Sequence, residues 1–250
     1  MPQNLKKSKP SKKGKIIPST KKRNYPKNPD QVSRNKAAAP QPAGERKQEA
    51  RVDLKPGALL SPLPAVMVTV GDMEKPNIIT IGWCGILSTD PPRAYISVRP
   101  SRYSHKLLSE RGEFVMNITT EELAEATDYA GIYTGAKVDK FKVTGLTPVK
   151  SHEVAPPTIA ESPLALECRV FQVIESGTHD IFLADIVSVS CSEKILDNGR
   201  ICLDRANLLA YAHGEYFTVG KRIGKFGFST DKQRRQKRAA EKNKEKKDIK

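Results

Sequence analysis

The sequence predicts a mainly β fold, a six-stranded antiparallel barrel with a few short helices. Short apolar runs rich in β-branched and aromatic residues recur between positions 65 and 193, and turn residues separate them. Only three segments have helical character. The chain also contains no βαβ alternation and no GxGxxG or GxxxxGKS motif, which argues against a Rossmann dinucleotide-binding domain or a P-loop.

Six segments have the length and composition of strands. The turn at 71–76 joins the first two, and residues 176–178 join the last two as a hairpin. In the fifth segment, apolar side chains from Leu164 onward alternate with the charged Glu167 and Arg169, the pattern of a strand with one face against a core. The six segments are 65–70, 77–83, 94–98, 114–118, 164–177 and 179–193.

Three segments carry signals for the start and end of a helix. Residues 101–112 begin with serine, contain two leucines and end at glycine. Residues 119–131 open with a capping box of Thr119 and Glu122 and also end at glycine. Residues 204–214 begin with an aspartate in a capping position and again end at glycine, so we expect a third helix there.

Charge and composition divide the chain into three parts. Residues 1–51 contain 15 Lys and Arg against 3 Asp and Glu, and residues 230–250 contain 10 against 4, so the tails carry the excess positive charge. Residues 1–51 also lack the apolar side chains that offset chain entropy on folding. We therefore expect a disordered basic N-terminal tail at 1–51, one folded domain at 52–229 and a basic C-terminal tail at 230–250.

Two interpretations of the tails stay open. They can be solvated segments that aid solubility, or they can make weak, salt-sensitive contacts with nucleic acid or another polyanion.

The sequence predicts a cytoplasmic protein without membrane association. No apolar run approaches the roughly 20 residues that a bilayer crossing needs, and no apolar stretch follows the basic N-terminus as a secretory signal requires. The lysine-rich, acid-poor N-terminus leaves an organelle transit peptide open. The four cysteines are widely spaced without a CxxC pair, so we expect no zinc site and no disulfide framework.

The first candidate site is the stretch NIITIGWCGILSTDPP, residues 77–92, which loses its large side chains where a core strand would keep them. Small side chains leave backbone N–H and C=O groups accessible, so a flat ligand such as a flavin ring can approach closely. A barrel bulge with glycine at a bend and a turn at residues 90–92 explains the same pattern. Taken alone, the stretch favours this structural explanation.

The second candidate site consists of Ser101, Arg102 and Ser104 at the start of the expected helix. Hydroxyl groups, a guanidinium and the free N–H groups of a helix start together favour binding of an anion. In the plainer alternative, Ser101 only caps the helix and Arg102 is solvated.

Two further residues are weaker candidates. Lys140 lies in a glycine-punctuated segment, 131–141, which can close over a ligand or be a solvated surface loop. His179 begins the strand after the hairpin, and its imidazole titrates near neutral pH, although a structural role is more common at such a position. No pair of histidines has metal-ligand spacing, and no Ser/His/Asp order indicates a nucleophile.

The order of these motifs resembles the flavin reductase-like family over residues 56–227. This resemblance implies an FMN-binding split β-barrel with Greek-key topology that forms a homodimer. The matching segments are the 77–89 stretch, then DPPRAYISVRPSRYS (90–104), FVMNI (114–118), GxxxGxxVDKF (131–141) and ESGTHDIFLADI (175–186).

The resemblance also implies roles for individual residues. His179 matches the histidine that lies near the nicotinamide in NADH-using members, and Lys140 is expected near the cofactor. No metal ligand is implied. The residues implied to bind FMN are Thr80, Ile81, Gly82, Trp83 and Cys84 along the ring, Ser88 and Thr89 toward the ribityl chain, and Ser101, Arg102 and Ser104 at the phosphate.

The expected function follows from the resemblance. It is that of an FMN-binding flavoprotein, an NAD(P)H-dependent flavin reductase or related oxidoreductase, with NAD(P)H and an unidentified electron acceptor as partners. The alternative is a non-catalytic FMN-binding or electron-transfer protein that its basic tails hold on nucleic acid or another polyanion. A barrel that has lost its flavin is a third, weaker alternative.

Overall fold

A computed structural model describes residues 50–231, and the chain divides into a unit at 1–56 and a unit at 57–250. The described part of the first unit, residues 50–56, is exposed and has no regular secondary structure. All helices and strands described below belong to the second unit. The expected tails at 1–51 and 230–250 lie almost entirely outside the described residues, so the domain boundaries stay predictions.

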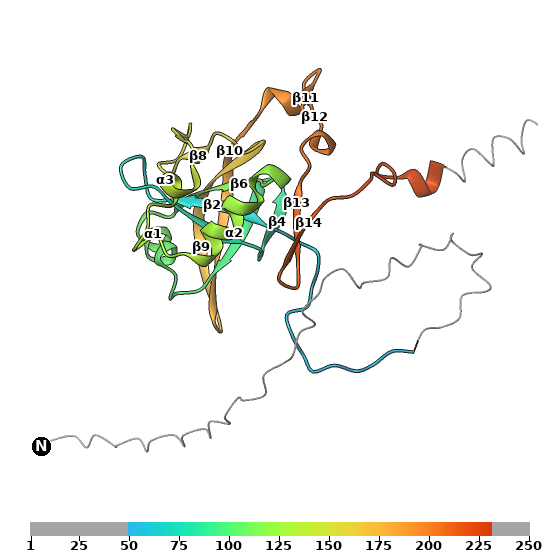
Figure 1. Cartoon of the computed structure of the whole chain (residues 1–250), viewed down its shortest axis with the longest axis horizontal. Coiled ribbons are helices and arrows are strands. Elements are labelled where there is room, and N and C mark those ends of the chain that lie inside the picture. Colours follow the sequence, from blue (N-terminus) through green and yellow to red (C-terminus); the bar gives the residue numbers. More distant parts are fainter. Residues whose placement is uncertain (1–49, 232–250) are drawn as a thin grey trace, which may run out of the picture. The chain divides into compact units, whose positions relative to one another are not determined.

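One antiparallel sheet of seven strands dominates the second unit (Figure 1). The strands are β2 (Val66–Val70), β3 (Asn77–Ile81), β4 (Cys84–Thr89), β5 (Pro92–Val98), β6 (Glu113–Asn117), β9 (Leu164–Ser176) and β10 (His179–Cys191). Their order is β3-β2-β6-β9-β10-β5-β4, so β3 and β4 are the two edges and the sheet is open between them. The mainly β fold class is confirmed, with seven strands in this sheet instead of six.

The additional strand, β4, forms where the sequence indicated a loss of strand character. Its backbone pairs with β5 from Cys84 to Thr89, with one irregularity between Ile86 and Ser88. Small and polar side chains do not prevent this pairing, because the ladder is made by backbone groups and β5 offers a complete neighbouring edge.

The expected helix at 204–214 is wrong, because residues 209–212 of this segment form the middle strand of a second, three-stranded sheet (Figure 1). The sheet has the order β1-β13-β14, with β1 at Leu63–Pro64, β13 at Leu209–Ala212 and β14 at Glu215–Thr218. His213 and Gly214 have positive φ values of 51° and 92°, as a tight hairpin turn requires. Only Leu203–Arg205 is helical here, as one 3₁₀ turn.

The other two expected helices are confirmed in position. They are α1 (Tyr103–Arg111) and α2 (Ala124–Ile132), which a 3₁₀ turn at Glu121–Leu123 precedes. The expected capping box is wrong, because the Thr119 hydroxyl donates to the carbonyl of Ala65 and no side chain caps the 3₁₀ turn. A short helix, α3 (Lys140–Thr144), forms at the end of the expected loop. No helix among residues 50–231 has the length and apolar composition that a membrane crossing needs.

Alternate residues of β2 face two separate clusters of buried side chains. Val68 belongs to the larger cluster, together with Ile96, Phe114 and Phe182. Met67 belongs to the second cluster, to which α2 and α3 contribute. This alternation follows from the period of two in a strand, and it shows that both faces of the sheet are covered here.

Glu167 departs from the expected alternation, because it is fully buried rather than exposed to solvent. Its carboxylate accepts hydrogen bonds from the backbone N–H groups of His152 (3.0 Å) and Glu153 (2.6 Å). These residues lie between two short strands, β7 (Pro148–Val149) and β8 (Thr158–Ile159). The segment between β7 and β8 covers the outer face of β9 and buries Glu167. The backbone N–H groups of this segment need an acceptor there, which the carboxylate provides. Two further short strands, β11 (Leu196–Asp197) and β12 (Arg200–Ile201), form a separate hairpin.

The ammonium group of Lys140 joins α2 to β3. Its Nζ donates to the carbonyl of Ile78 at 2.6 Å and to that of Ala130 at 2.7 Å, and only 4% of the residue is exposed. Nearby, the Thr80 hydroxyl donates to the carbonyl of Thr127 at 2.5 Å. Side chains thus hold α2 against the edge strand β3 at two points.

We expect Lys140→Met to lower the free energy of unfolding by about 2–3 kcal/mol, because it leaves two backbone carbonyls without their charged donor. Urea denaturation measures this change. Lys142→Met is the matched control, since Lys142 is exposed on the same helix and its loss should change stability by no more than about 0.5 kcal/mol. Equal stability of the two variants would contradict the role of Lys140 as a clamp.

Candidate functional site

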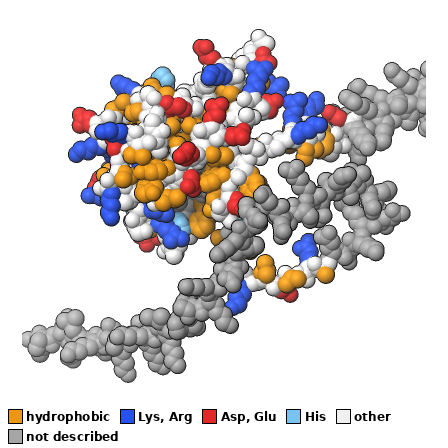
Figure 2. Space-filling view, in the orientation of Figure 1, with side chains coloured by type: hydrophobic (Ala, Val, Ile, Leu, Met, Phe, Trp, Pro, Cys, Tyr) orange, Lys and Arg blue, Asp and Glu red, His pale blue; other side chains and the backbone are white. Residues whose placement is uncertain are grey.

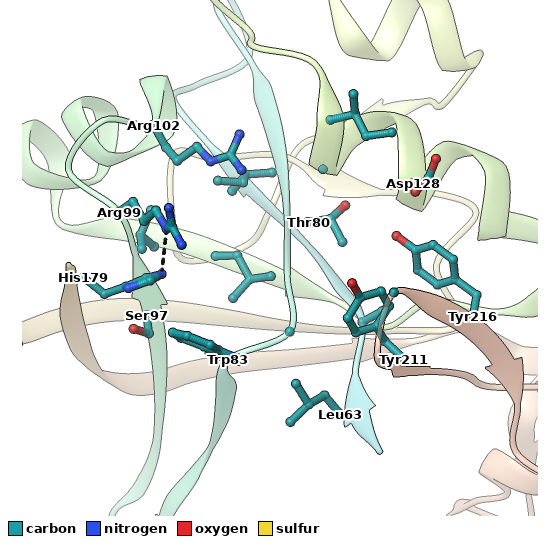
Figure 3. A pocket seen from close by; sticks show the side chains of 18 residues that line it. Leu63, Thr80, Trp83, Ser97, Arg99, Arg102, Asp128, His179, Tyr211 and Tyr216 are labelled. Carbon is teal, nitrogen blue, oxygen red and sulfur yellow. Dashed lines mark hydrogen bonds between the residues drawn. The ribbon is translucent and has the colours of Figure 1, made fainter. Parts of the chain in front are cut away.

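A cavity of about 360 Å³ lies between β3, α2 and the β13–β14 hairpin (Figure 3). Segments far apart in the sequence form its walls: the end of β5, the start of β10, and the turn that follows β3. In Figure 3, Arg99, Arg102, His179 and Trp83 lie on one side of Thr80, and Asp128, Tyr211 and Tyr216 lie on the other.

Residues 80–83 of the small-residue stretch line this cavity. Strand β3 ends at Ile81, and the turn at Gly82 and Trp83 breaks the alternation of side chains. For this reason Thr80, Ile81 and Trp83 all reach one cavity, although a continuous strand would separate them. Gly82 leaves the backbone accessible, and Trp83 is 42% exposed.

Cys84, Ser88 and Thr89 do not line this cavity. The Cys84 side chain belongs to the larger buried cluster, and burial raises the pKa of its thiol to about 12. Ser88 and Thr89 lie at the far end of β4, where the Ser88 hydroxyl donates to the carbonyl of Asp90 at 3.3 Å. The structure therefore brings together only the first part of the 77–92 stretch with the other candidate residues.

A smaller recess of about 80 Å³ adjoins the cavity, with which it shares Ile79, Arg102 and Gly131. Ser101 and Ser104, Lys140 and Gly135 also line it. No side chain caps the amino end of α1, so N–H groups of its first turn remain available. One small recess is therefore lined by Ser101, Arg102 and Ser104, the residues expected at the phosphate, and by Lys140, which was expected near the cofactor.

The residues around the recess leave a free hydrogen-bond donor and open space for an anion. The Ser104 hydroxyl is buried and accepts a hydrogen bond from Asn77 Nδ2 at 2.8 Å, which leaves its own proton free to donate. A Cβ atom on Gly135 would overlap Asn77 Oδ1, so no side chain can enter the recess from this position. None of the residues that line the recess is acidic.

Burial, and secondarily the charge of Arg102, lower the pKa of Lys140 to about 8. The ammonium form still predominates at neutral pH. An anion in the recess would stabilise the Lys140 ammonium, since Arg102 disfavours its charged form.

His179 packs against Trp83, with 4.6 Å between the ring centroids. Its Nε2 faces Arg99 Nε at 3.4 Å, and its Nδ1 lies 2.9 Å from the Thr178 hydroxyl. Burial, and secondarily the charge of Arg99, lower the pKa of His179, while Asp180 acts in the opposite direction. The imidazole is therefore neutral at neutral pH, with Nε2 as the acceptor.

The interpretation of the sequence missed the side of the cavity that Asp128, Tyr211 and Tyr216 form. The two tyrosines come from the β13–β14 hairpin, and only its first strand and turn lie in the segment 204–214 that we expected to be helical. The signal for the hairpin was present, because aromatic residues flank the His213-Gly214 pair on both sides. Within residues 50–231, no group of three or more His, Cys, Asp or Glu side chains is placed to hold a metal ion.

The chain matches known proteins in three comparisons: with a family model, with protein sequences and with solved structures. The family model described as flavin reductase like domain matches residues 59–220. An uncharacterised protein of Archaeoglobus fulgidus is 35% identical over 160 residues, which cover 64% of this chain and 89% of that protein. The structure of flavoredoxin from Desulfovibrio vulgaris (Miyazaki F) is similar with a TM-score of 0.66 and 32% identity, over 70% of this chain and 97% of that chain. An FMN-binding protein from Thermus thermophilus, solved with bound p-hydroxybenzaldehyde, is similar with a TM-score of 0.60 and 25% identity, over 72% and 99%.

We expect the pKa of His179 to rise when Arg99 is replaced by glutamine, because one cause of its low value is removed. Titration of the imidazole signals by NMR measures this shift. Arg93→Gln is the control, since Arg93 pairs with Asp185 and should leave the pKa of His179 unchanged. A His179 pKa that stays the same in the Arg99 variant would contradict this electrostatic account.

Proposed function

The chain belongs to the flavin reductase-like domain family, and on this premise we propose that it is an FMN-binding flavoprotein and an NAD(P)H-dependent flavin reductase. One observation carries the proposal. A cationic recess adjoins a cavity whose wall is a strand end with small side chains and accessible backbone. A flavin mononucleotide has the matching parts, a phosphate at one end and a flat ring at the other.

The residues present fit FMN. Arg102, Lys140 and the Ser104 hydroxyl provide two positive charges and one hydrogen-bond donor for a phosphate dianion. The FMN-binding protein of T. thermophilus supports FMN, rather than another flavin, as the cofactor. A bound FMN would supply two-electron chemistry between a nicotinamide nucleotide and an electron acceptor.

The protein's own residues would bind and orient the two nucleotides. Residues 80–83 offer backbone groups to the ring edge, and Trp83 offers an apolar surface. His179, neutral and held between Arg99 and Thr178, would contact the nicotinamide side of the cavity. Cys84, Ser88 and Thr89 are left without a role in this proposal because they lie outside the cavity.

A homodimer and a cytoplasmic location also belong to the proposal. Apolar side chains are exposed on β4, β9 and β10, including Ile86, Phe171 and Val189, and Figure 2 shows that hydrophobic side chains reach the surface among charged ones on the face drawn. Exposed apolar surface of this kind favours association. Contact of the basic tails with a polyanion is retained as a proposal from the sequence alone.

Arg102→Ala combined with Ser104→Ala should weaken FMN binding by about a hundredfold or more, since each charge-assisted contact is worth about 1.5–3 kcal/mol. Quenching of Trp83 fluorescence measures the affinity, because Trp83 is the single tryptophan in the chain. The pair Lys106→Ala and Ser109→Ala on the exposed face of α1 is the matched control and should bind FMN normally. Equal FMN affinity in the two double variants would mean that the phosphate binds elsewhere.

Anaerobic mixing of the FMN-loaded protein with NADH or NADPH separates a reductase from a non-catalytic carrier. We expect the flavin absorbance to bleach, and we expect His179→Ala to slow bleaching more than it weakens FMN binding. Bleaching by neither nucleotide would contradict the reductase function and favour the electron-transfer alternative. A His179→Ala variant that loses FMN but keeps its bleaching rate would give His179 a structural role.

A further inference from the structure

The two sides of the cavity carry opposite charge (Figure 3). Arg99 and Arg102 lie on one side, at the end of β5 and the start of α1. Asp128 lies across from them on α2, beside Tyr216 of β14. Among residues 50–231, no lysine, arginine or histidine forms an ion pair with Asp128. The negative charge of Asp128 is therefore available to a molecule in the cavity.

Tyr216 lies beside the Asp128 carboxylate. Figure 3 shows its hydroxyl and the carboxylate pointing toward each other. Burial of the phenol, and then the charge of Asp128 and a hydrogen bond to it, raise the pKa of Tyr216 to about 12. The phenol stays protonated at neutral pH, with its hydroxyl directed at the Asp128 carboxylate (Figure 3). The remaining lone pairs of the carboxylate can then accept a hydrogen bond from a ligand.

The walls beside Asp128 favour a flat ligand. Tyr211 packs edge-to-face on Tyr216, with 5.3 Å between ring centroids. Leu63 of β1 lies next to Tyr211, and Trp83 lies on the opposite side of the cavity (Figure 3). Aromatic and aliphatic surfaces that face each other across a cavity bind planar rings well, while a few polar groups set the orientation of the ring.

We propose that Asp128, Tyr216 and Tyr211 form a second-substrate subsite for a planar aromatic compound with a hydrogen-bond donor on its edge, and that Asp128 accepts this hydrogen bond. The subsite rests on the proposed function, in which FMN occupies the rest of the cavity and the recess. Tyr216 is a positioning residue, since it acts through Asp128, and Tyr211 provides an aromatic surface. An aromatic compound with a carboxylate on this edge is disfavoured, because Asp128 repels it.

The direct test compares two probes that differ only in this donor, 4-hydroxyacetophenone and 4-methoxyacetophenone. Isothermal titration calorimetry of the full-length protein measures both affinities, with and without FMN, at a pH at which the phenol is neutral. We expect the hydroxy compound to bind about tenfold more tightly, the effect of one hydrogen bond to a charged acceptor. Equal affinities, tighter binding of the methoxy compound, or no binding of either would overturn the subsite.

Variants then identify the acceptor. Asp128→Asn should abolish the preference for the hydroxy compound, and Tyr216→Phe should reduce it. The matched controls are Glu125→Gln and Tyr129→Phe on the same helix, which do not line the cavity and should keep the preference. A preference that persists in Asp128→Asn would overturn the assignment.

The arm with FMN separates the two proposals. A protein that takes up no FMN but keeps the Asp128-dependent preference would contradict the proposed function and support the subsite. FMN uptake without any preference would contradict only the subsite.

Discussion

The geometry of the site depends on one buried cation, the ammonium group of Lys140. A buried ammonium is costly unless hydrogen bonds replace its hydration, and the carbonyls of Ile78 and Ala130 provide two of them. One carbonyl belongs to an edge strand and the other to the last turns of α2. Lys140 therefore sets how close this helix lies to the open edge of the sheet, and the cavity and the recess both lie along that junction.

The Lys140 ammonium group also contributes to the proposed binding of an anion in the recess. Lys140 and Arg102 share a recess without any acidic residue, so the charged form of Lys140 is disfavoured until an anion enters. Across the cavity, Asp128 gives the opposite wall a negative charge. A ligand with a phosphate at one end would place that phosphate at the cationic side, in the recess. The second substrate would then bind at the opposite side, beside Asp128. Neutral His179 adds a polar group to the cationic side without adding charge.

The sequence predicted what depends on local pattern and missed what depends on distant contacts. Six strands of the main sheet, two helices and the Ser101–Ser104 helix start follow from side-chain periodicity and turn residues. The burial of Glu167 did not follow, since a segment fifteen residues earlier in the chain covers it. Residues 204–214 were misread because Asp204 in a capping position and a closing Gly214 are typical of a helix, while the His213-Gly214 turn and a partner strand at Leu63–Pro64 decide the outcome. Asp128 gave no signal in the sequence, because only the packing of α2 beside that hairpin brings it to the cavity.

The most direct test of this account is a crystal structure of the protein with FMN. We expect the phosphate in the recess, in contact with Arg102 and the Ser104 hydroxyl and near Lys140, and the ring beside residues 80–83, with Trp83 at its apolar side. A phosphate bound outside the recess, or a ring that does not contact residues 80–83, would contradict it.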